Sequence, residues 1–320
     1  MVNTKSLGTR QIPLRLAEII TKMANKEWDD GTFLDKVSKT TQDLLRFWDP
    51  KGSFADLRNV NFHQGQWQAI INMIYMHEVL KVKDVHDMYM SVYPELLQEM
   101  DLVDLKKDKY SHPKYCIKMA TATGKTWILN ALLMWQYLNA KHEEKNGKYC
   151  KNFLLIAPGI IVYERLLDAY LGKRKLDGTR DFDTSDFKKF NELFLPPSYE
   201  EEILGFIKSS VAQKEDIGTK VTGDGLIAIT NWHLLIGDED IPEDGTPLDS
   251  PDKAVKDLLP ITPGTSAGHS LDELDRGYLR GKELDYLAGL GVWWSSTTRR
   301  TILENGKLPS RCLTKSGKKQ

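Results

Sequence analysis

Residues 119–126, Met-Ala-Thr-Ala-Thr-Gly-Lys-Thr, lie between an apolar run at residues 115–120 and a helical pattern at residues 127–140. A phosphate-binding loop needs inward-pointing backbone N–H groups, a helix N-terminus behind them, a lysine for the β- and γ-phosphates and a hydroxyl for Mg²⁺. Lys125 and Thr126 fit the last two roles, and Gly124 permits close approach of the backbone. The strand-loop-helix order therefore predicts a nucleotide site. Its residues are Thr121, Ala122, Thr123, Gly124, Lys125 and Thr126, with Thr126 as the Mg²⁺ ligand.

Two further apolar strands follow the loop. Residues 152–158 form an apolar run that ends at a proline, residues 160–171 have helical spacing, and residues 225–230 form a third apolar strand. Continuous apolar strands that alternate with helices are typical of a parallel sheet covered on both faces. We therefore expect an α/β fold built on a parallel sheet.

The remaining segments suggest additions to this lobe. Helical spacing is present at residues 14–48 and 64–80. Residues 172–222 are charged and irregular, and residues from about 236 to 285 begin with a stretch rich in Pro, Gly and Asp, so we expect both to be insertions. We divide the chain into a helical segment at residues 1–60, an α/β lobe at residues 61–290 and an irregular tail at residues 291–320.

Composition excludes several classes of protein. Apolar residues make up 41% and charged residues 28% of the 320 residues, as is usual for globular proteins. A net charge of −1 gives no global basic field, so any contact with nucleic acid must be local to a groove. Cys116, Cys150 and Cys312 lack the spacing of a zinc site. There is no apolar signal-peptide core and no stretch approaching the roughly 18 apolar residues of a membrane span, so we expect a cytoplasmic protein without a membrane partner.

The phosphate loop departs from the general GxxxxGK[ST] pattern, because Met119 occupies the position of the first glycine. Kinases and transporter ATPases normally keep that glycine. Residues 120–126 instead resemble the loop of superfamily-2 helicases, with Ala122 where a glycine is usual. Alanine resists positive φ, so either the loop does not need that conformation at Ala122 or it binds phosphate more weakly.

Three other stretches resemble helicase motifs. Residues 62–70, Phe-His-Gln-Gly-Gln-Trp-Gln-Ala-Ile, resemble the Q-motif, in which a glutamine amide binds the adenine edge and an aromatic residue before it packs on the base; Gln66 is the matching glutamine. Pro158 and Gly159 match motif Ia, and Thr230 and Asn231 match the end of a later strand, both of which contact the DNA backbone in that superfamily. Each stretch alone is equally compatible with an ordinary helix start or buried strand.

Taken in order, these stretches resemble the helicase portion of the restriction (Res) subunit of type III restriction enzymes. The resemblance covers roughly residues 35–290 and includes residues 41–48, 61–66, 119–126 and 261–269. It implies a RecA-like lobe, ATP and Mg²⁺ as ligands, ATP hydrolysis that drives DNA translocation, a second motor lobe, a nuclease domain, and a methyltransferase (Mod) partner that recognises the DNA sequence. The residues alone also allow a self-contained P-loop nucleotide-binding module with a regulatory role.

The carboxylate pair that such motors use to hold Mg²⁺ and orient water is missing from the sequence, which contains no Asp-Glu-x-His. The nearest candidate, residues 238–240 (Asp-Glu-Asp), leads into a stretch rich in Pro and Gly. We therefore expect the chain to be truncated before this motif, to contain no catalytic residue and to turn over no ATP alone.

The codons around residues 293–302 suggest where the motif is. Tryptophan has the single codon TGG. Joining the third base of the Trp293 codon to the first two bases of the Trp294 codon therefore gives GTG, a Val codon. The following joints permit Val, Phe, Asn, Asp, Glu, Ala, His and His, provided that Ser295 ends in T, Thr298 in G and Arg299 is AGG. This spells an apolar strand that runs into Asp-Glu-Ala-His. We expect residues 291–320 to be out of frame through loss of one nucleotide near codons 290–292.

Overall fold

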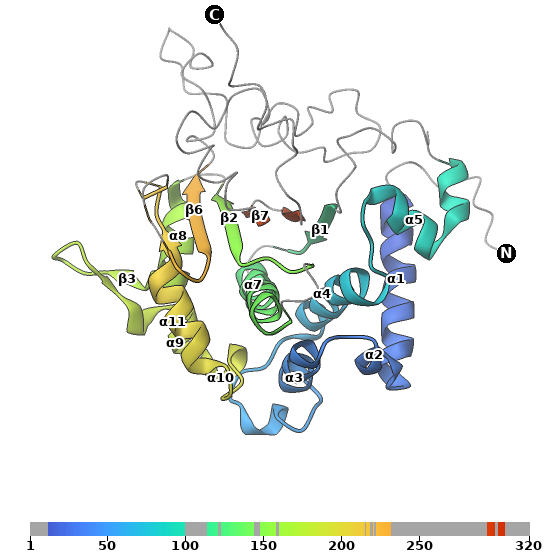
Figure 1. The fold of residues 1–320 in the computed structure, drawn as a ribbon, viewed down its shortest axis with the longest axis horizontal. Coiled ribbons are helices and arrows are strands. Elements are labelled where there is room, and N and C mark those ends of the chain that lie inside the picture. Colours follow the sequence, from blue (N-terminus) through green and yellow to red (C-terminus); the bar gives the residue numbers. More distant parts are fainter. Residues whose placement is uncertain are drawn as a thin grey trace, which may run out of the picture.

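The computed structural model describes residues 12–99, 114–120, 123–143, 148–157, 160–214, 216–217, 220, 222–231, 293–297 and 300–304. These residues form one six-stranded sheet with helices packed around it (Figure 1). In sheet order, the strands are β1 (Lys114–Lys118), β8 (Arg300–Glu304), β7 (Trp293–Thr297), β2 (Asn152–Ala157), β6 (Leu226–Asn231) and β5 (Val211–Ala212).

The sheet is parallel except for one strand. β2 pairs in parallel with both β6 and β7, and β5 pairs in parallel with β6. β8 is antiparallel to both of its neighbours, β1 and β7, so β1 runs in the same direction as the other four strands. The predicted α/β fold with a parallel sheet is confirmed, and β8 is the exception.

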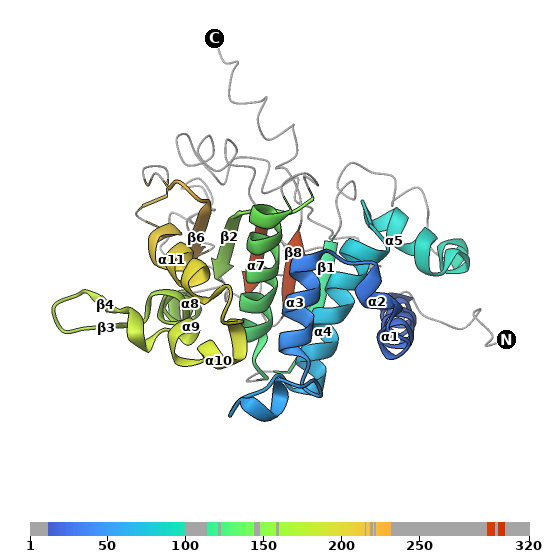
Figure 2. The ribbon, with the colours of Figure 1, turned by 60° about the horizontal axis from the view of Figure 1, so that its bottom comes forward.

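Helix α7 (Lys125–His142) is the centre of the packing. Every residue from Ile128 to Asn139 is buried, which is expected for a helix that is covered on all sides. Figures 1 and 2 show it against the sheet, with α3 and α4 on one side and α8, α10 and α11 on the other. Because α7 begins at Lys125, the burial of its remaining length fixes the position of the phosphate loop.

The N-terminal helices belong to the same core. They are α1 (Ile12–Asp29), α2 (Thr32–Asp35), α3 (Lys39–Trp48), the 3-10 turn η2 (Ala55–Leu57), α4 (Gln64–Ile74), the π-helical turn η3 (Tyr75–Val79), α5 (Val85–Val92) and the 3-10 turn η4 (Pro94–Glu99). Trp48 is fully buried, and its indole N–H donates to the carbonyl oxygen of Phe194 at 2.9 Å. The expected helical segment is therefore packed into the lobe.

A buried polar cluster joins α3, η3 and the C-terminal half of α7. Glu78 is 6% exposed, and its carboxylate accepts from the Ser38 backbone N–H at 2.8 Å, the Trp135 indole N–H at 2.8 Å and the Thr41 hydroxyl. Burial raises the pKa of Glu78 above its ordinary value, while these hydrogen bonds lower it. Thr41 Oγ1 also accepts from Asn139 Nδ2 at 3.0 Å. A buried carboxylate is tolerated here because donors surround it.

Replacing Thr41 by Val should lower the free energy of unfolding by about 1–3 kcal/mol, because the Asn139 and Trp135 donors and the Glu78 acceptor each lose a partner in a buried place. Urea unfolding of both proteins measures this. Thr40→Val is the matched control, since Thr40 is also buried but its hydroxyl bonds to the partly exposed Glu143 at 3.4 Å and to Tyr199, outside the cluster around Glu78. Equal losses in the two variants would contradict the assigned role of the cluster.

Residues 172–222 are more regular than expected. They form a hairpin of β3 (Lys173–Arg174) and β4 (Arg180–Asp181), the turn η7 (Phe182–Thr184), and helices α9 (Asp186–Lys189), α10 (Asn191–Phe194) and α11 (Glu200–Ser210), followed by β5. The expectation of irregular structure is wrong for the described residues of this segment, and β5 extends the main sheet, while the interpretation of the segment as an insertion stays a prediction. In α11 the charges occupy one face, while Ile203, Phe206 and Ile207 are buried on the other.

The helix α8 (Ile160–Leu171) follows β2 and leads into the β3–β4 hairpin. Arg180 fixes the hairpin to it, with guanidinium contacts to Glu164 at 2.6 Å and Asp168 at 2.9 Å. Gly172 begins the hairpin at φ +84°, where a Cβ would collide with the backbone of Asp181. The hairpin base therefore requires glycine.

The tail at residues 291–320 was expected to be irregular, and this is wrong for residues 293–297 and 300–304. β7 and β8 pair with each other, and each also pairs with an existing strand. Trp, Thr and Ile favour strands when neighbouring strands supply partners. The strands β1 and β2 provide those partners, and a periodicity analysis of the local sequence does not detect them.

Candidate nucleotide-binding site

Gly124 sets the shape of the phosphate loop. It is the N-cap of α7 and has φ +80°, a left-handed conformation that glycine adopts without strain. A Cβ at this position would collide with Nε2 of Gln66. The Gln66 side chain at the start of α4 (Gln64–Ile74) therefore lies against the loop, and the positive φ of Gly124 would strain any other residue.

The side chains of the loop point back onto its own carbonyl groups. Lys125 Nζ donates to the carbonyl oxygens of Ala120 at 2.8 Å and Met119 at 3.2 Å, and Thr123 Oγ1 donates to Ala120 at 2.7 Å. These carbonyl oxygens thus accept the hydrogen bonds of the Lys125 ammonium group that phosphate oxygens could accept. Thr126 follows in the first turn of α7 and is partly buried. Thr121 and Ala122 lie outside the described residues.

Gln66 joins α4 to this loop. Its side chain is 2% exposed, its Oε1 accepts from the His63 backbone N–H at 2.8 Å, and its Nε2 donates to the Thr123 carbonyl oxygen at 3.0 Å. The first bond is half of a capping box that starts the helix. An amide has two N–H donors and two acceptor lone pairs, so one of each remains for a ligand.

A pocket of about 560 Å³ opens between α4 and the loop. This volume lies within the range of small-molecule sites. It is lined by His63, Gly65, Gln66, Met119, Ala120, Thr123, Gly124 and Trp127. The structure therefore brings together Gln66, Thr123 and Gly124, which the sequence predicted to act jointly although residues 66 and 123 are far apart in the chain.

The family can be assigned from the comparison with known sequences. The model of the family described as "Type III restriction enzyme, res subunit" matches residues 59–237, more than half of the chain. The chain belongs to this family. The match includes Gln66, the phosphate loop, β2, α8 and β6, and it gives the chain a helicase-like ATP-binding lobe with a RecA-like P-loop fold. No curated protein and no solved structure matches the chain significantly.

The site residues of this Res-family lobe fit a nucleotide on structural grounds. Gly124 holds the left-handed conformation that brings the loop against the Gln66 amide, and the ammonium of Lys125 is held by two carbonyl oxygens that an anion can replace. Thr126 offers a hydroxyl for Mg²⁺ at the helix N-terminus. Among the described residues, no group of three His, Cys, Asp or Glu side chains could hold a metal ion, and residues 238–240 lie outside that part of the chain.

The residues expected to contact DNA are only partly described. Thr230 in β6 is 1% exposed, so its side chain is buried and does not face the solvent. Asn231 ends β6 and pairs with Ala157, the last residue of β2. Pro158 and Gly159 lie outside the described residues. The end of β6 therefore lies beside Ala157, the last described residue before Pro158.

The sequence analysis did not identify Trp127. Phe62, the aromatic residue just before Gln66, is 2% exposed and packs against Trp48 and Phe194 with ring centroids 6.2 and 6.0 Å apart. It does not line the pocket, whereas Trp127 does. The only sequence signal for Trp127 was its position two residues after Lys125, in the first turn of the helix.

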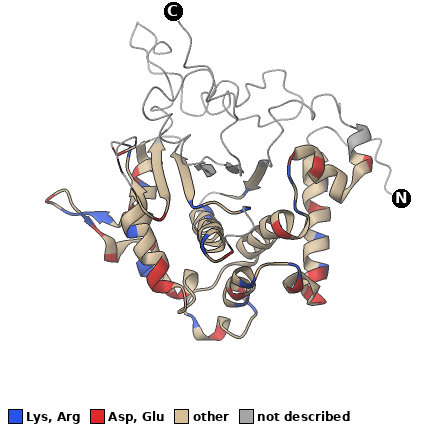
Figure 3. Cartoon of the chain, viewed as in Figure 1, with Lys and Arg blue, Asp and Glu red and all other residues tan. Residues whose placement is uncertain are grey.

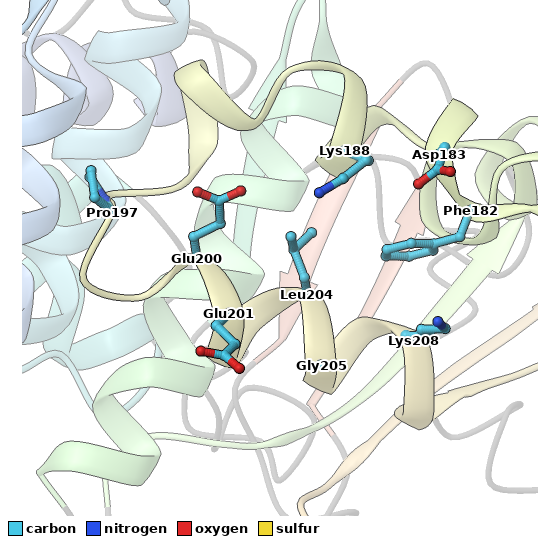
Figure 4. Close-up of a pocket in the computed structure, with 9 residues that line it drawn as sticks. All are labelled: Phe182, Asp183, Lys188, Pro197, Glu200, Glu201, Leu204, Gly205 and Lys208. Atoms are coloured by element: carbon cyan, nitrogen blue, oxygen red, sulfur yellow. The ribbon is translucent and has the colours of Figure 1, made fainter.

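A second pocket, of about 570 Å³, lies between η7 and α9 on one side and α11 on the other (Figure 4). Lys188 and Lys208 line it together with Glu200 and Glu201, so charges of both signs face it. It contains none of the predicted site residues, and its mixed charge gives no preference for an anion such as phosphate. The nucleotide site is therefore assigned to the pocket beside the phosphate loop.

Proposed function

We propose that the chain is the nucleotide-binding lobe of an ATP-driven DNA translocase whose movement is coupled to DNA cleavage in the intact Res subunit. The observation that supports this proposal is the hydrogen bond from Gln66 Nε2 to the Thr123 carbonyl oxygen, because it brings an amide of the kind that binds an adenine edge next to the loop that precedes α7. In this proposal Gln66 binds the adenine edge, the backbone of Thr121, Ala122, Thr123 and Gly124 surrounds the phosphates, Lys125 neutralises the β- and γ-phosphates, and Thr126 holds Mg²⁺.

The chain alone should bind ADP weakly and hydrolyse no ATP, because the sequence lacks the Asp-Glu pair that orients the attacking water. Calorimetric titration with ADP and Mg²⁺, combined with an assay of phosphate release, tests this. Binding without turnover supports the proposal. Robust turnover by the purified 320-residue chain would instead support a self-contained P-loop module.

DNA should bind weakly, without sequence preference and with strong dependence on salt. The proposed contacts are backbone groups near Pro158, Gly159, Thr230 and Asn231, and sequence recognition is assigned to the methyltransferase partner. Figure 3 shows Lys and Arg interspersed with Asp and Glu over the described helices, which agrees with a net charge of −1. About three phosphate contacts would give a slope of about −2.7 for the logarithm of affinity against the logarithm of salt concentration.

Fluorescence anisotropy with two labelled duplexes of unrelated sequence measures this slope between 50 and 200 mM salt, a range over which binding to phosphates weakens steeply. Lys125→Ala is the matched control, since it should retain DNA binding while changing the nucleotide site. Sequence-specific binding that persists at high salt would rule out the proposed mode of contact.

Among the described residues, none of the helices combines the length and apolar character needed to cross a membrane.

A further inference from the structure

We propose that the indole ring of Trp127 is the surface on which the base of the nucleotide packs, which makes Trp127 a base-binding residue of the site. The inference rests on the proposed nucleotide-binding function. It adds a residue that belongs neither to the phosphate loop nor to the stretch around Gln66. Three observations support it: the position of the ring, the side chains that hold it there, and the burial of Phe62, the aromatic residue whose place it takes.

Trp127 borders the space between the loop and α4. Its backbone N–H donates to the Gly124 carbonyl oxygen at 2.9 Å, which fixes it in the first turn of α7. Its Cε3 atom lies 3.9 Å from the position that a Cβ on Gly124 would take, and Gln66 contacts the same position from the opposite element. The ring and the Gln66 amide therefore border one pocket, and both lie beside the phosphate cradle.

The ring is held in place by two other aromatic side chains. Its centroid lies 5.0 Å from that of Phe190 and 6.1 Å from that of Phe194, at interplanar angles of 56° and 87°. Phe194 is fully buried, so one side of the indole is packed into the core. A ring ordered before the ligand arrives loses little side-chain entropy on binding, which favours affinity.

The chemistry of the pocket suits a purine. A base has an apolar face and a polar edge, and the pocket offers an indole for the face and the remaining donor and acceptor of Gln66 for the edge. Phe62 cannot take the first role, because it is buried against Trp48 and Phe194. Base stacking on an aromatic side chain tolerates any base, so Trp127 should favour nucleosides in general and Gln66 should select adenine.

The test compares ADP with inorganic tripolyphosphate as ligands of the full chain, both titrated by calorimetry. Trp127→Leu should lower the affinity for ADP about tenfold and leave the affinity for tripolyphosphate unchanged, because tripolyphosphate has no base. Trp127→Phe keeps an aromatic ring and should lose about threefold or less. Phe62→Leu is the control, and should leave the affinity for ADP unchanged in a protein that still unfolds cooperatively.

The outcomes separate the inference from the function on which it rests. If the unmodified chain binds neither ligand, the proposed function is wrong and the inference is wrong with it. If the unmodified chain binds both and Trp127→Leu binds ADP equally well, only the inference is overturned. A parallel loss of both ligands in Trp127→Leu would also overturn it, because Trp127 would then act by supporting the loop.

Discussion

Lys125→Ala is expected to remove measurable ADP binding while the fold survives. Among the described residues, the ammonium group donates to the loop carbonyls of Met119 and Ala120, and no hydrogen bond joins it to a core side chain there. A charge-assisted hydrogen bond to an ionised group contributes about 1.5–3 kcal/mol, which corresponds to a loss of roughly 10- to 150-fold in affinity. Since the starting affinity should be weak, such a loss would leave no detectable binding.

Calorimetric titration with ADP measures the effect, and circular dichroism checks the fold. Lys141→Ala is a matched control on the same helix, because Lys141 lies at the opposite end of α7 and forms partly exposed ion pairs with Glu202 and Asp224. Such pairs contribute little to stability. Unchanged ADP affinity in Lys125→Ala, with unchanged circular dichroism, would refute the assignment of the phosphate loop.

Restoring one nucleotide near codons 290–292 should convert the protein from one without ATP turnover into a DNA-dependent ATPase. We propose this because of the joint codons described above and because of the position of β7. β7 ends at Thr297, and the Asp codon of the alternative frame spans codons 297 and 298. β7 runs in the same direction as β1, through their shared antiparallel neighbour β8. Restoring the frame replaces the residues of β7 by an apolar run, and a strand in the place of β7 would put the carboxylates that follow it at the edge of the sheet from which the phosphate loop starts.

The gene sequence provides the first check, and phosphate release by the restored protein with DNA and its partner subunit provides the second. Turnover on the order of 1 s⁻¹ or faster is expected for an active enzyme. A restored protein in which the new Asp and Glu codons encode Asn and Gln is the control, and it should bind ATP without hydrolysing it. An alternative frame that lacks Asp-Glu-Ala-His codons, or that stops directly after them, would end this proposal.

Much of the lobe could be predicted because its central elements have strong local patterns. The strands expected at residues 152–158 and 225–230 are β2 and β6, and the helix expected at residues 160–171 is α8. An uninterrupted apolar strand has few alternatives to burial in a sheet. The phosphate loop was found for a similar reason, since Gly124 and Lys125 stand where a strand meets a helix.

The parts that could not be predicted depend on contacts between distant residues. β5 is only two residues long, and it is a strand because β6 supplies its hydrogen-bonding partners. β8 is antiparallel to β7 because only two residues separate the two strands, which is too few for a parallel crossover, and it also pairs with the distant strand β1. Trp127 lines the pocket because Phe190 and Phe194 hold its ring, and these residues lie in a segment that was expected to be irregular. Periodicity describes neighbours along the chain and carries no information on such partners.

The cluster around Glu78 also has a mechanical consequence. α7 has 18 residues and is therefore a rod of about 27 Å. One end of the rod holds the phosphate loop, and Trp135 and Asn139 near the other end are anchored to Glu78 and Thr41. A displacement of the loop therefore moves the contacts of α7 with α3, and α3 lies before residues 59–237, which the family model matches. Trimming the chain to residues 59–237 would remove α3 with Thr41 and keep the hydrogen bond from Trp135 to Glu78, so the far end of α7 would be fixed at fewer points.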